Sequence, residues 1–290
     1  MQTRIEETAN YRAIYLNGKT IRFTIDPNKP ITELKFPEFY DVAINTWCAG
    51  RCPFCYTDAK HTGIHFPNIV QRITNFFGPM SSNERPFQVA LGGAGEPTAH
   101  PDFIEVLKTF SDLGITPNYT TNGMHITEEI LNATVKYCGG VALSCHPHLS
   151  KYWKPAVAQF RARGIKLNLH VIVSDKTSIQ LLDQIYQEYK QQVDYFVLLP
   201  YQSVGRAPKK HIDYEALELW VNHTNNVGNL AFGSNFFEFL KDKAHWDVSI
   251  YPPEIMSKYL ILDEGPSLYS NSFELRQVNL PKLDQTKVYG

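Results

Sequence analysis

Three of the chain's five cysteines lie close together, in the run Cys48-Ala-Gly-Arg-Cys52-Pro-Phe-Cys55. Three thiolates on one short loop can bind one metal centre. Structural zinc prefers four ligands, usually from two separated pairs, and no second pair follows this loop. An iron–sulfur cluster normally takes four cysteines, so three would leave one iron open to an exogenous ligand. The spacing favours a reactive iron–sulfur centre over structural zinc.

A glycine-rich run, Leu-Gly-Gly-Ala-Gly-Glu-Pro from Leu91 to Pro97, follows an apolar stretch. Glycines at a strand end let the backbone approach a ligand closely. Glu96 can accept a hydrogen bond from a ligand ammonium group. A tight turn would explain the glycine pair but not the whole run, so we expect a ligand-binding loop.

The composition of the chain limits the classes of protein to which it can belong. The chain has 290 residues, of which 43% are hydrophobic and 20% charged, and this is typical of a folded globular enzyme. A net charge of −1 makes binding of extended nucleic acid unfavourable. We find no apolar run long enough to span a membrane and no signal peptide in Met1 to Asn10. The odd cysteine count argues against a disulfide framework, so we expect a cytoplasmic protein.

The elements that must position these residues alternate along the chain. Asn17-Gly18 joins two apolar stretches, Tyr11 to Leu16 and Thr20 to Ile25, which predicts a hairpin. From Tyr40, six strand–helix units follow, with strands near 40–46, 87–91, 116–120, 141–145, 166–173 and 195–199. Such units form a parallel sheet with right-handed crossovers. Six units are fewer than the eight of a closed barrel, so the prediction is an α/β fold with a partial (β/α)6 TIM-like barrel, functional at the carboxyl ends of its strands.

Local signals predict the helix starts and the organisation of the chain. Pro67, Thr127 and Ser150 are expected to open helices, as is a capping box at Thr177 and Gln180. After about residue 226 the alternation weakens, and we expect a helix at 236–241, a strand at 258–262 and a hairpin. The predicted parts are an N-terminal hairpin extension (1–39), the barrel core (40–207) and a C-terminal α+β extension (208–290).

The cysteine loop, with an aromatic residue before its last cysteine and a barrel strand before its first, resembles the radical S-adenosylmethionine (SAM) superfamily. The glycine run resembles the Gly-Glu-Pro segment of that superfamily, and Thr-Thr-Asn-Gly at 120–123 resembles its Thr-Asn-Gly segment. The resemblance covers residues 40–207. It implies a [4Fe–4S] cluster on Cys48, Cys52 and Cys55, which binds SAM and cleaves it reductively to a 5′-deoxyadenosyl radical. That radical abstracts hydrogen from a substrate.

The resemblance also implies contacts to SAM. Gly93, Gly95 and Glu96 would hold its methionine end. Further contacts are expected from residues at other strand ends and loops, which are Tyr56, Thr121, Asn122, Ser144, Ile172, Leu199 and Arg206.

Substrate chemistry has weaker candidates at the expected barrel mouth. His146 and His148 could bind or protonate a substrate group, or lie on a solvated loop. Cys145 could donate a hydrogen atom, although a buried inert cysteine is the commoner case. Tyr201 follows the sixth strand and is a third candidate. Cys138 and His170 are expected to be core residues.

The substrate stays open between a peptide, a nucleotide and a small metabolite. A flavodoxin- or ferredoxin-type electron donor is required as a partner by the implied chemistry. No cysteine follows residue 145, so an auxiliary cluster is not supported. Two alternatives are a glycyl-radical activating enzyme and a non-catalytic metal-binding or interaction protein.

Overall fold

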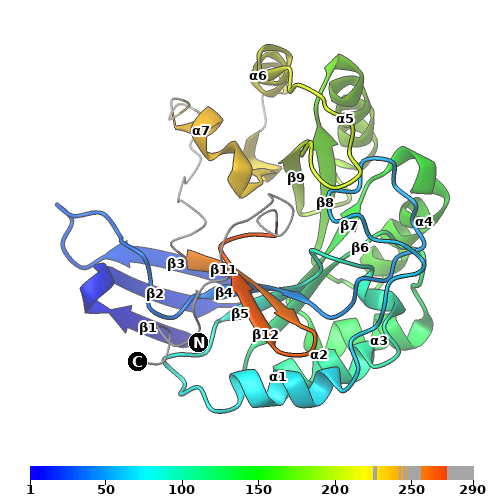
Figure 1. Cartoon of the computed structure of the whole chain (residues 1–290). Helices are drawn as coiled ribbons and strands as arrows, with labels where there is room; N and C mark the ends of the chain where they lie inside the picture. The colour runs from blue at the N-terminus through cyan, green and yellow to red at the C-terminus, as the bar shows by residue number, and fades with distance from the viewer. Residues whose placement is uncertain (225–226, 242, 244–245, 247–255, 273–290) are drawn as a thin grey trace.

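A long curved sheet with helices on its outer face organises the molecule, as the computed structural model shows (Figure 1). The structure describes residues 1–224, 227–241, 243, 246 and 256–272. The sheet has nine strands in the order β10-β9-β8-β7-β6-β5-β4-β11-β12. Its six central strands are β4 (Phe39–Ala43), β5 (Gln88–Leu91), β6 (Thr116–Thr121), β7 (Gly140–Ser144), β8 (Leu167–Val173) and β9 (Tyr195–Pro200).

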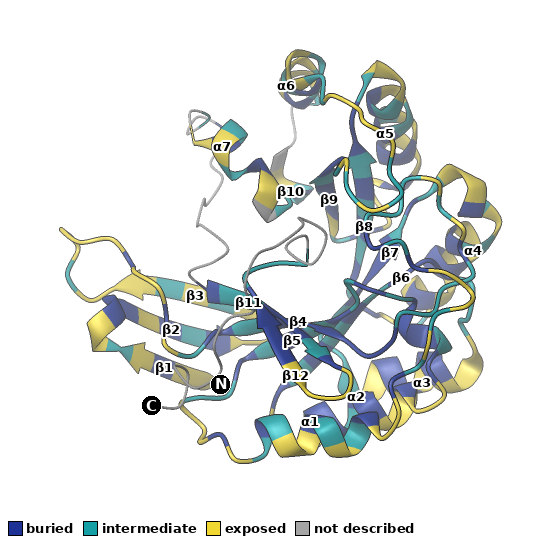
Figure 2. Ribbon diagram, in the orientation of Figure 1, coloured by how far each residue is buried: buried dark blue, intermediate teal, exposed yellow. Residues whose placement is uncertain are grey.

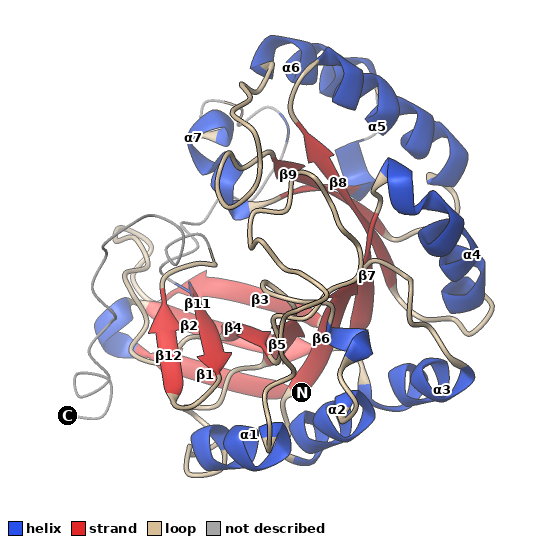
Figure 3. Cartoon of the chain, turned by 45° about the vertical axis from the view of Figure 1, so that its right-hand side comes forward, coloured by secondary structure: helices blue, strands red, loops and turns tan. Residues whose placement is uncertain are grey.

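These six strands are parallel and adjacent in sequence order, as predicted. The helices that connect or follow them are α1 (Ile69–Phe77), α2 (Phe103–Asp112), α3 (Glu128–Tyr137), α4 (Ser150–Arg161), α5 (Lys176–Tyr189) and α6 (Tyr214–His223). Figure 3 shows the helices wrapped around the convex side of the sheet. The concave side faces the loops that follow the strands.

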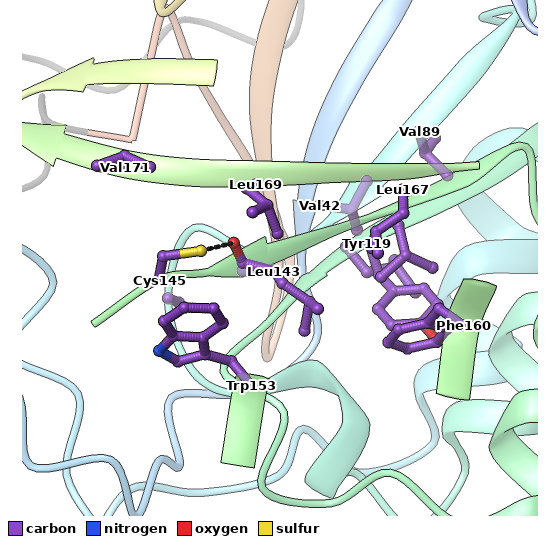
Figure 4. Close-up of a cluster of buried hydrophobic side chains, with 14 of the residues drawn as sticks. Val42, Val89, Tyr119, Leu143, Cys145, Trp153, Phe160, Leu167, Leu169 and Val171 are labelled. Atoms are coloured by element: carbon purple, nitrogen blue, oxygen red, sulfur yellow. Dashed lines mark hydrogen bonds between the residues drawn. The ribbon is translucent and has the colours of Figure 1, made fainter. Parts of the chain in front are cut away.

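Strand alternation separates two faces of the sheet. On β8, Leu169, Val171 and Val173 are buried in the main core, whereas His170 and Ile172 between them are only partly buried. Successive strand side chains point to opposite faces, so His170 and Ile172 lie on the concave face. Figure 4 shows the core face, where Leu169 and Leu143 lie on the same side as Trp153 of α4. In Figure 2 the strands of the large sheet are mostly buried, and the helices outside them are partly exposed.

The C-terminal extension adds strands at both edges of the sheet. The strand β10 (Leu230–Phe232) pairs parallel with β9, and β11 (Ser257–Leu262) pairs parallel with β4. A final strand, β12 (Pro266–Tyr269), pairs antiparallel with β11, which confirms the predicted hairpin. The predicted helix at 236–241 is α7 (Phe237–Leu240). Within the described residues, β10 and β12 do not pair, so the barrel is open.

The N-terminal hairpin is confirmed and has a third strand that the sequence did not predict. The strands β2 (Tyr11–Leu16) and β3 (Lys19–Thr24) form the hairpin, and β1 (Gln2–Glu6) pairs antiparallel with β2. Tyr11 and Tyr15 of β2 lie in a small second core. Buried Glu38, just before β4, accepts hydrogen bonds from Tyr11 and Arg22 and so ties this sheet to the barrel. The boundaries at 39/40 and 207/208 stay predictions.

The predicted start of α3 agrees with the structure, whereas the other predicted helix starts differ from it. Thr127 caps α3 by accepting from the Ile130 amide, as expected. The other predicted starts are wrong by one or two residues. Helix α1 begins at Ile69 rather than Pro67, Leu149 rather than Ser150 precedes α4, and Asp175 caps α5 in place of the capping box at Thr177. Asp175 prevails because its carboxylate accepts from the Ser178 amide at 3.1 Å. None of the described helices is long and apolar enough to cross a membrane.

Candidate active site

A cavity of about 330 Å³ lies on the concave face, where the six strands end. The predicted site residues that line it are Cys52, Cys55, Tyr56, Gly93, Ser144, His146, Ile172, Leu199 and Tyr201. Residues from the cysteine loop, the glycine run and the ends of β7, β8 and β9 are therefore brought together. The remaining predicted residues lie outside the cavity lining: Cys48, Gly95, Glu96, Thr121, Asn122, Cys145 and Arg206.

The cysteine loop is folded by its own backbone hydrogen bonds. The Cys55 amide donates to the Cys52 carbonyl at 3.2 Å, and the Cys48 amide donates to the Lys60 carbonyl at 2.9 Å. Donors also point at the sulfurs: the Gly50 amide lies 3.3 Å from Cys48 Sγ, and Asn122 Nδ2 lies 3.7 Å from it. Such donors stabilise a thiolate.

The thiols themselves need a positive partner to ionise. Burial raises the pKa of Cys48 to about 11 and that of Cys52 to about 12. A metal centre is the partner that deprotonates a coordinating thiol. The loop therefore fits the implied cluster by its three half-buried thiols and by its N–H···S contacts. Among the described residues, no group of three or more His, Cys, Asp or Glu side chains is arranged to hold a metal ion.

Arg206 holds the cysteine loop rather than lining the cavity. Its Nε donates to the Cys52 carbonyl at 2.8 Å and its Nη2 to the Ala59 carbonyl at 2.6 Å. Its Nη1 also pairs with Asp58 at 3.2 Å. The planar fork of a guanidinium suits three such acceptors at once. These contacts give Arg206 a positioning role in the cysteine loop, and its contact to SAM stays a prediction.

The two histidines of the Cys145-His-Pro-His148 segment also pack on this loop. His148 Nε2 donates to the Gly50 carbonyl at 3.2 Å, and the ring of Phe54 lies edge-on to His146 at 4.9 Å between centroids. Burial lowers the pKa of His146 to about 3, so its imidazole is neutral near pH 7. His146 lines the cavity, whereas His148 serves as a loop anchor.

Cys145 faces the core rather than the cavity. Its side chain is buried, and its Sγ donates to the Leu143 carbonyl at 3.6 Å (Figure 4). Burial raises the pKa of its thiol. The arrangement is that of a buried neutral thiol, the alternative noted from the sequence. Cys138, expected in the core, is the partly buried C-terminal cap of α3.

Glu96 is buried and its carboxylate accepts several hydrogen bonds from the protein. It accepts from Thr98 Oγ1 at 2.6 Å, from Thr121 Oγ1 at 2.7 Å and from the Asn122 amide at 2.9 Å. Burial raises its pKa, and these hydrogen bonds oppose the shift. Glu96 therefore joins the loop after β5 to the end of β6, and its contact to SAM stays a prediction.

The glycine run has little room for side chains. A Cβ at Gly95 would collide with Asn45 Oδ1 and the Trp47 carbonyl. Gly93 adopts a positive φ of 76°, and a Cβ there would lie 2.6 Å from the ring of Tyr259. The Tyr259 hydroxyl donates to the Gly93 carbonyl at 3.1 Å. The C-terminal strand β11 thus holds the glycine run in place.

Polar side chains on the concave face of the strands were missed or misassigned. Asp41 of β4 lines the cavity and was not predicted. His170 of β8 also lines it, so its assignment to the core was wrong. Burial lowers the pKa of His170 to about 4. The signal was present in the sequence, because both residues alternate with apolar residues that face the helices. Asn235 and Ser272 of the C-terminal extension complete the lining from a part of the chain without a motif.

A second hollow of about 610 Å³ adjoins the cavity beside α5. The two share Phe54, His146, Ile172 and Tyr201, which form the wall between them. Tyr201 is held there by the hydrogen bond from its hydroxyl to the Pro208 carbonyl at 2.9 Å.

Comparison with known proteins gives the class of this site. Residues 42–146 match the family model of the radical SAM superfamily, which identifies this part of the chain as a radical SAM domain. The matched segment contains the cysteine loop, the glycine run and the Thr-Asn-Gly segment. No curated protein matches the chain.

Solved structures share its fold. Streptococcus suis SuiB bound to precursor peptide SuiA has a TM-score of 0.67 and 16% identity, over 87% of this chain and 63% of SuiB. The enzyme anSMEcpe with bound AdoMet and Cp18Cys peptide has a TM-score of 0.57 and 15% identity, over 82% of this chain and 74% of that one. The chain spans less than two thirds of the length of SuiB. The likeness confirms the predicted α/β fold with a partial TIM barrel.

Proposed function

We propose that the protein is a radical SAM enzyme that modifies a peptide. The observation that supports this most is the convergence on one cavity of the cysteine loop, the glycine run and an apolar wall from β8 and β9. Each feature alone has a simpler explanation. Their meeting at the carboxyl ends of parallel strands is typical of a cofactor site.

In this proposal, Cys48, Cys52 and Cys55 hold the [4Fe–4S] cluster. When bound, the cluster and SAM supply a 5′-deoxyadenosyl radical that abstracts a hydrogen atom from the substrate, after reduction by a flavodoxin- or ferredoxin-type donor. The donors on Gly50 and Asn122 stabilise the Cys48 thiolate. Because Arg206 fixes the carbonyl of Cys52, it holds the loop in its binding conformation.

The other predicted residues divide into contacts and supports. The backbone at Gly93 is open to the cavity and suits the methionine end of SAM, while Ile172, Leu199 and Tyr56 form the surface for its adenine. Ser144 supplies a hydroxyl between them. The supporting residues are Gly95, Glu96, Thr121 and Asn122, which shape the loops from behind.

A peptide is the substrate class with the most support. SuiB and anSMEcpe, which share the fold, are described with peptides bound. None of the residues that line the cavity in the described structure is lysine or arginine. A nucleotide would bring phosphates that such residues usually neutralise. The cavity therefore suits an uncharged or positively charged substrate better than a nucleotide.

The test is anaerobic reconstitution with iron and sulfide, followed by reduction with dithionite and measurement of 5′-deoxyadenosine from SAM. We expect the wild type to release 5′-deoxyadenosine and Cys52→Ala to lose both its colour and this activity. Cys138→Ala also removes one thiol but lies outside the site, so it should keep both. Cleavage of SAM by Cys52→Ala would contradict the cluster assignment. A glycyl radical formed on a partner protein would instead favour the activating-enzyme alternative.

A further inference from the structure

We propose that Asp41 binds a positively charged group of the substrate, such as the ammonium group of a lysine side chain. This inference rests on the proposed function, because it assigns one specificity-determining contact within the same cavity.

The geometry of β4 places the Asp41 side chain in the cavity. Its neighbours Tyr40 and Val42 are buried on the opposite face of the sheet, where the ring of Tyr40 meets that of Phe77 in α1 at 5.5 Å between centroids. Alternation then turns Asp41 to the concave face, and it lines the cavity there. In the sheet register Asp41 pairs with Ala90, two residues before Gly92. Asp41 thus lies deeper than the glycine run.

Asp41 has no partner among the residues that the structure describes. Its carboxylate makes no hydrogen bond or ion pair with another described residue, in contrast to the carboxylate of Glu96 with its three close donors. An unpaired carboxylate out of bulk water is unfavourable unless a ligand compensates it. Burial accordingly raises the pKa of Asp41 to about 6.

No other described residue of the lining supplies a positive charge that could pair with Asp41. Among the described lining residues it is the one Asp, Glu, Lys or Arg. The two histidines of the lining are neutral near pH 7, because burial lowers the pKa of His146 to about 3 and that of His170 to about 4. Apart from the thiols assigned to the cluster, the described lining therefore carries a single negative charge, on Asp41. Its best complement is a cation that donates hydrogen bonds, which is an ammonium or guanidinium group.

The experiment measures which peptides the reconstituted protein retains in equilibrium dialysis with SAM present. The probes are three pools of blocked pentapeptides that differ at the central residue: lysine, norleucine or glutamate. We expect the lysine pool to be retained at least about tenfold better than the norleucine pool, as one charge-assisted hydrogen bond allows, and the glutamate pool least. Asp41→Asn should abolish this preference. The matched control Asp112→Asn, at an exposed site on α2, should keep it.

Equal retention of the three pools by the wild type would overturn the inference, as would a lysine preference that survives in Asp41→Asn. The SAM dissociation constant is measured in parallel. If Asp41→Asn weakens SAM binding and keeps the peptide preference, Asp41 binds the ammonium group of SAM and the inference is wrong. Failure of the proposed function looks different, because the wild type would then release no 5′-deoxyadenosine whichever pool it retains.

Discussion

The polar residues around the cavity form two sets, which differ in whether their side chains make hydrogen bonds within the described protein. The rim set, Glu96, Asn122, His148 and Arg206, lies on the loops that follow the strands, and each member makes hydrogen bonds within the protein. The floor set, Asp41, Ser144 and His170, lies on the concave face of the strands and lines the cavity. No side chain of the floor set has a hydrogen-bond partner among the described residues.

This difference separates the residues that support the fold from the residues that contact a ligand. Buried polar groups in folded proteins are nearly always hydrogen-bonded, so a set of open ones beside a cavity indicates a ligand. The rim set can be expected to determine stability and retention of the cluster. The floor set can be expected to determine what binds, with little effect on folding at neutral pH. The predictions below test this division.

The largest effect should come from Glu96→Ala. The change leaves the donors of Thr98, Thr121 and Asn122 without their shared acceptor in the core. We expect a loss of about 3 kcal/mol in the free energy of unfolding, measured with urea. Glu105→Ala on the exposed face of α2 is the control and should change it by less than about 0.5 kcal/mol. A similar small loss for Glu96→Ala would show that the rim does not support the fold.

His170 should make stability depend on pH. Its pKa is lowered to about 4 by burial, so the unfolded chain takes up a proton first as the pH falls below about 6.5. The folded state therefore loses stability on acidification. Between pH 7 and pH 4.5 we expect the wild type to lose about 2 kcal/mol more than His170→Gln in urea titrations.

The control is His211→Gln, a substitution at an exposed position. Its free energy of unfolding should match that of the wild type at each pH. Parallel curves for the wild type and His170→Gln would mean that His170 is not the buried neutral residue that the floor requires.

Arg206→Lys should loosen the cysteine loop. A lysine cannot replace the three hydrogen bonds of the guanidinium to Cys52, Asp58 and Ala59. Supporting residues around metal ligands typically change metal affinity by about 10–100-fold. We expect iron to leave the reconstituted variant about tenfold faster in the presence of a chelator. Arg161→Lys, in a surface ion pair with Asp194, should release iron as the wild type does.

Ser144→Ala should have the smallest effect on the fold. Its hydroxyl has no hydrogen-bond partner in the part of the chain that the structure describes, so the free energy of unfolding should change by less than about 0.5 kcal/mol. If the hydroxyl contacts SAM, the KM for SAM should rise about fivefold, which is the effect of one neutral hydrogen bond. Unchanged KM with reduced stability would reverse the division between the two sets.

Much of the barrel could be predicted because its signals are local. Most of its strands are short, largely apolar segments that end in a glycine or polar segment, and the cysteine and glycine motifs stand where two of those strands end. The edge strands were harder. The strand β1 carries polar residues on both sides of Ile5, and β10 has three residues, so only its pairing with β9 makes it a strand.

The roles within the site depended on contacts between distant segments. Glu96 in a Gly-Glu-Pro run resembles a ligand-binding residue until Thr121 and Asn122 are placed against it. Arg206 is separated from Cys52 by 154 positions, so nothing in the sequence shows that it holds the cysteine loop. Asp41 was not predicted as a site residue, because its apolar neighbours indicate a buried strand. A charged residue in such a strand is itself a signal of a functional site.

The central claim is that the cysteine loop holds a cluster whose open iron binds SAM. The most direct measurement is the EPR spectrum of the anaerobically reconstituted, dithionite-reduced protein, recorded with and without SAM alongside its iron content. We expect about four irons per chain and a [4Fe–4S]⁺ signal that changes when SAM is added. One bound zinc, with no such signal and no 5′-deoxyadenosine, would contradict it.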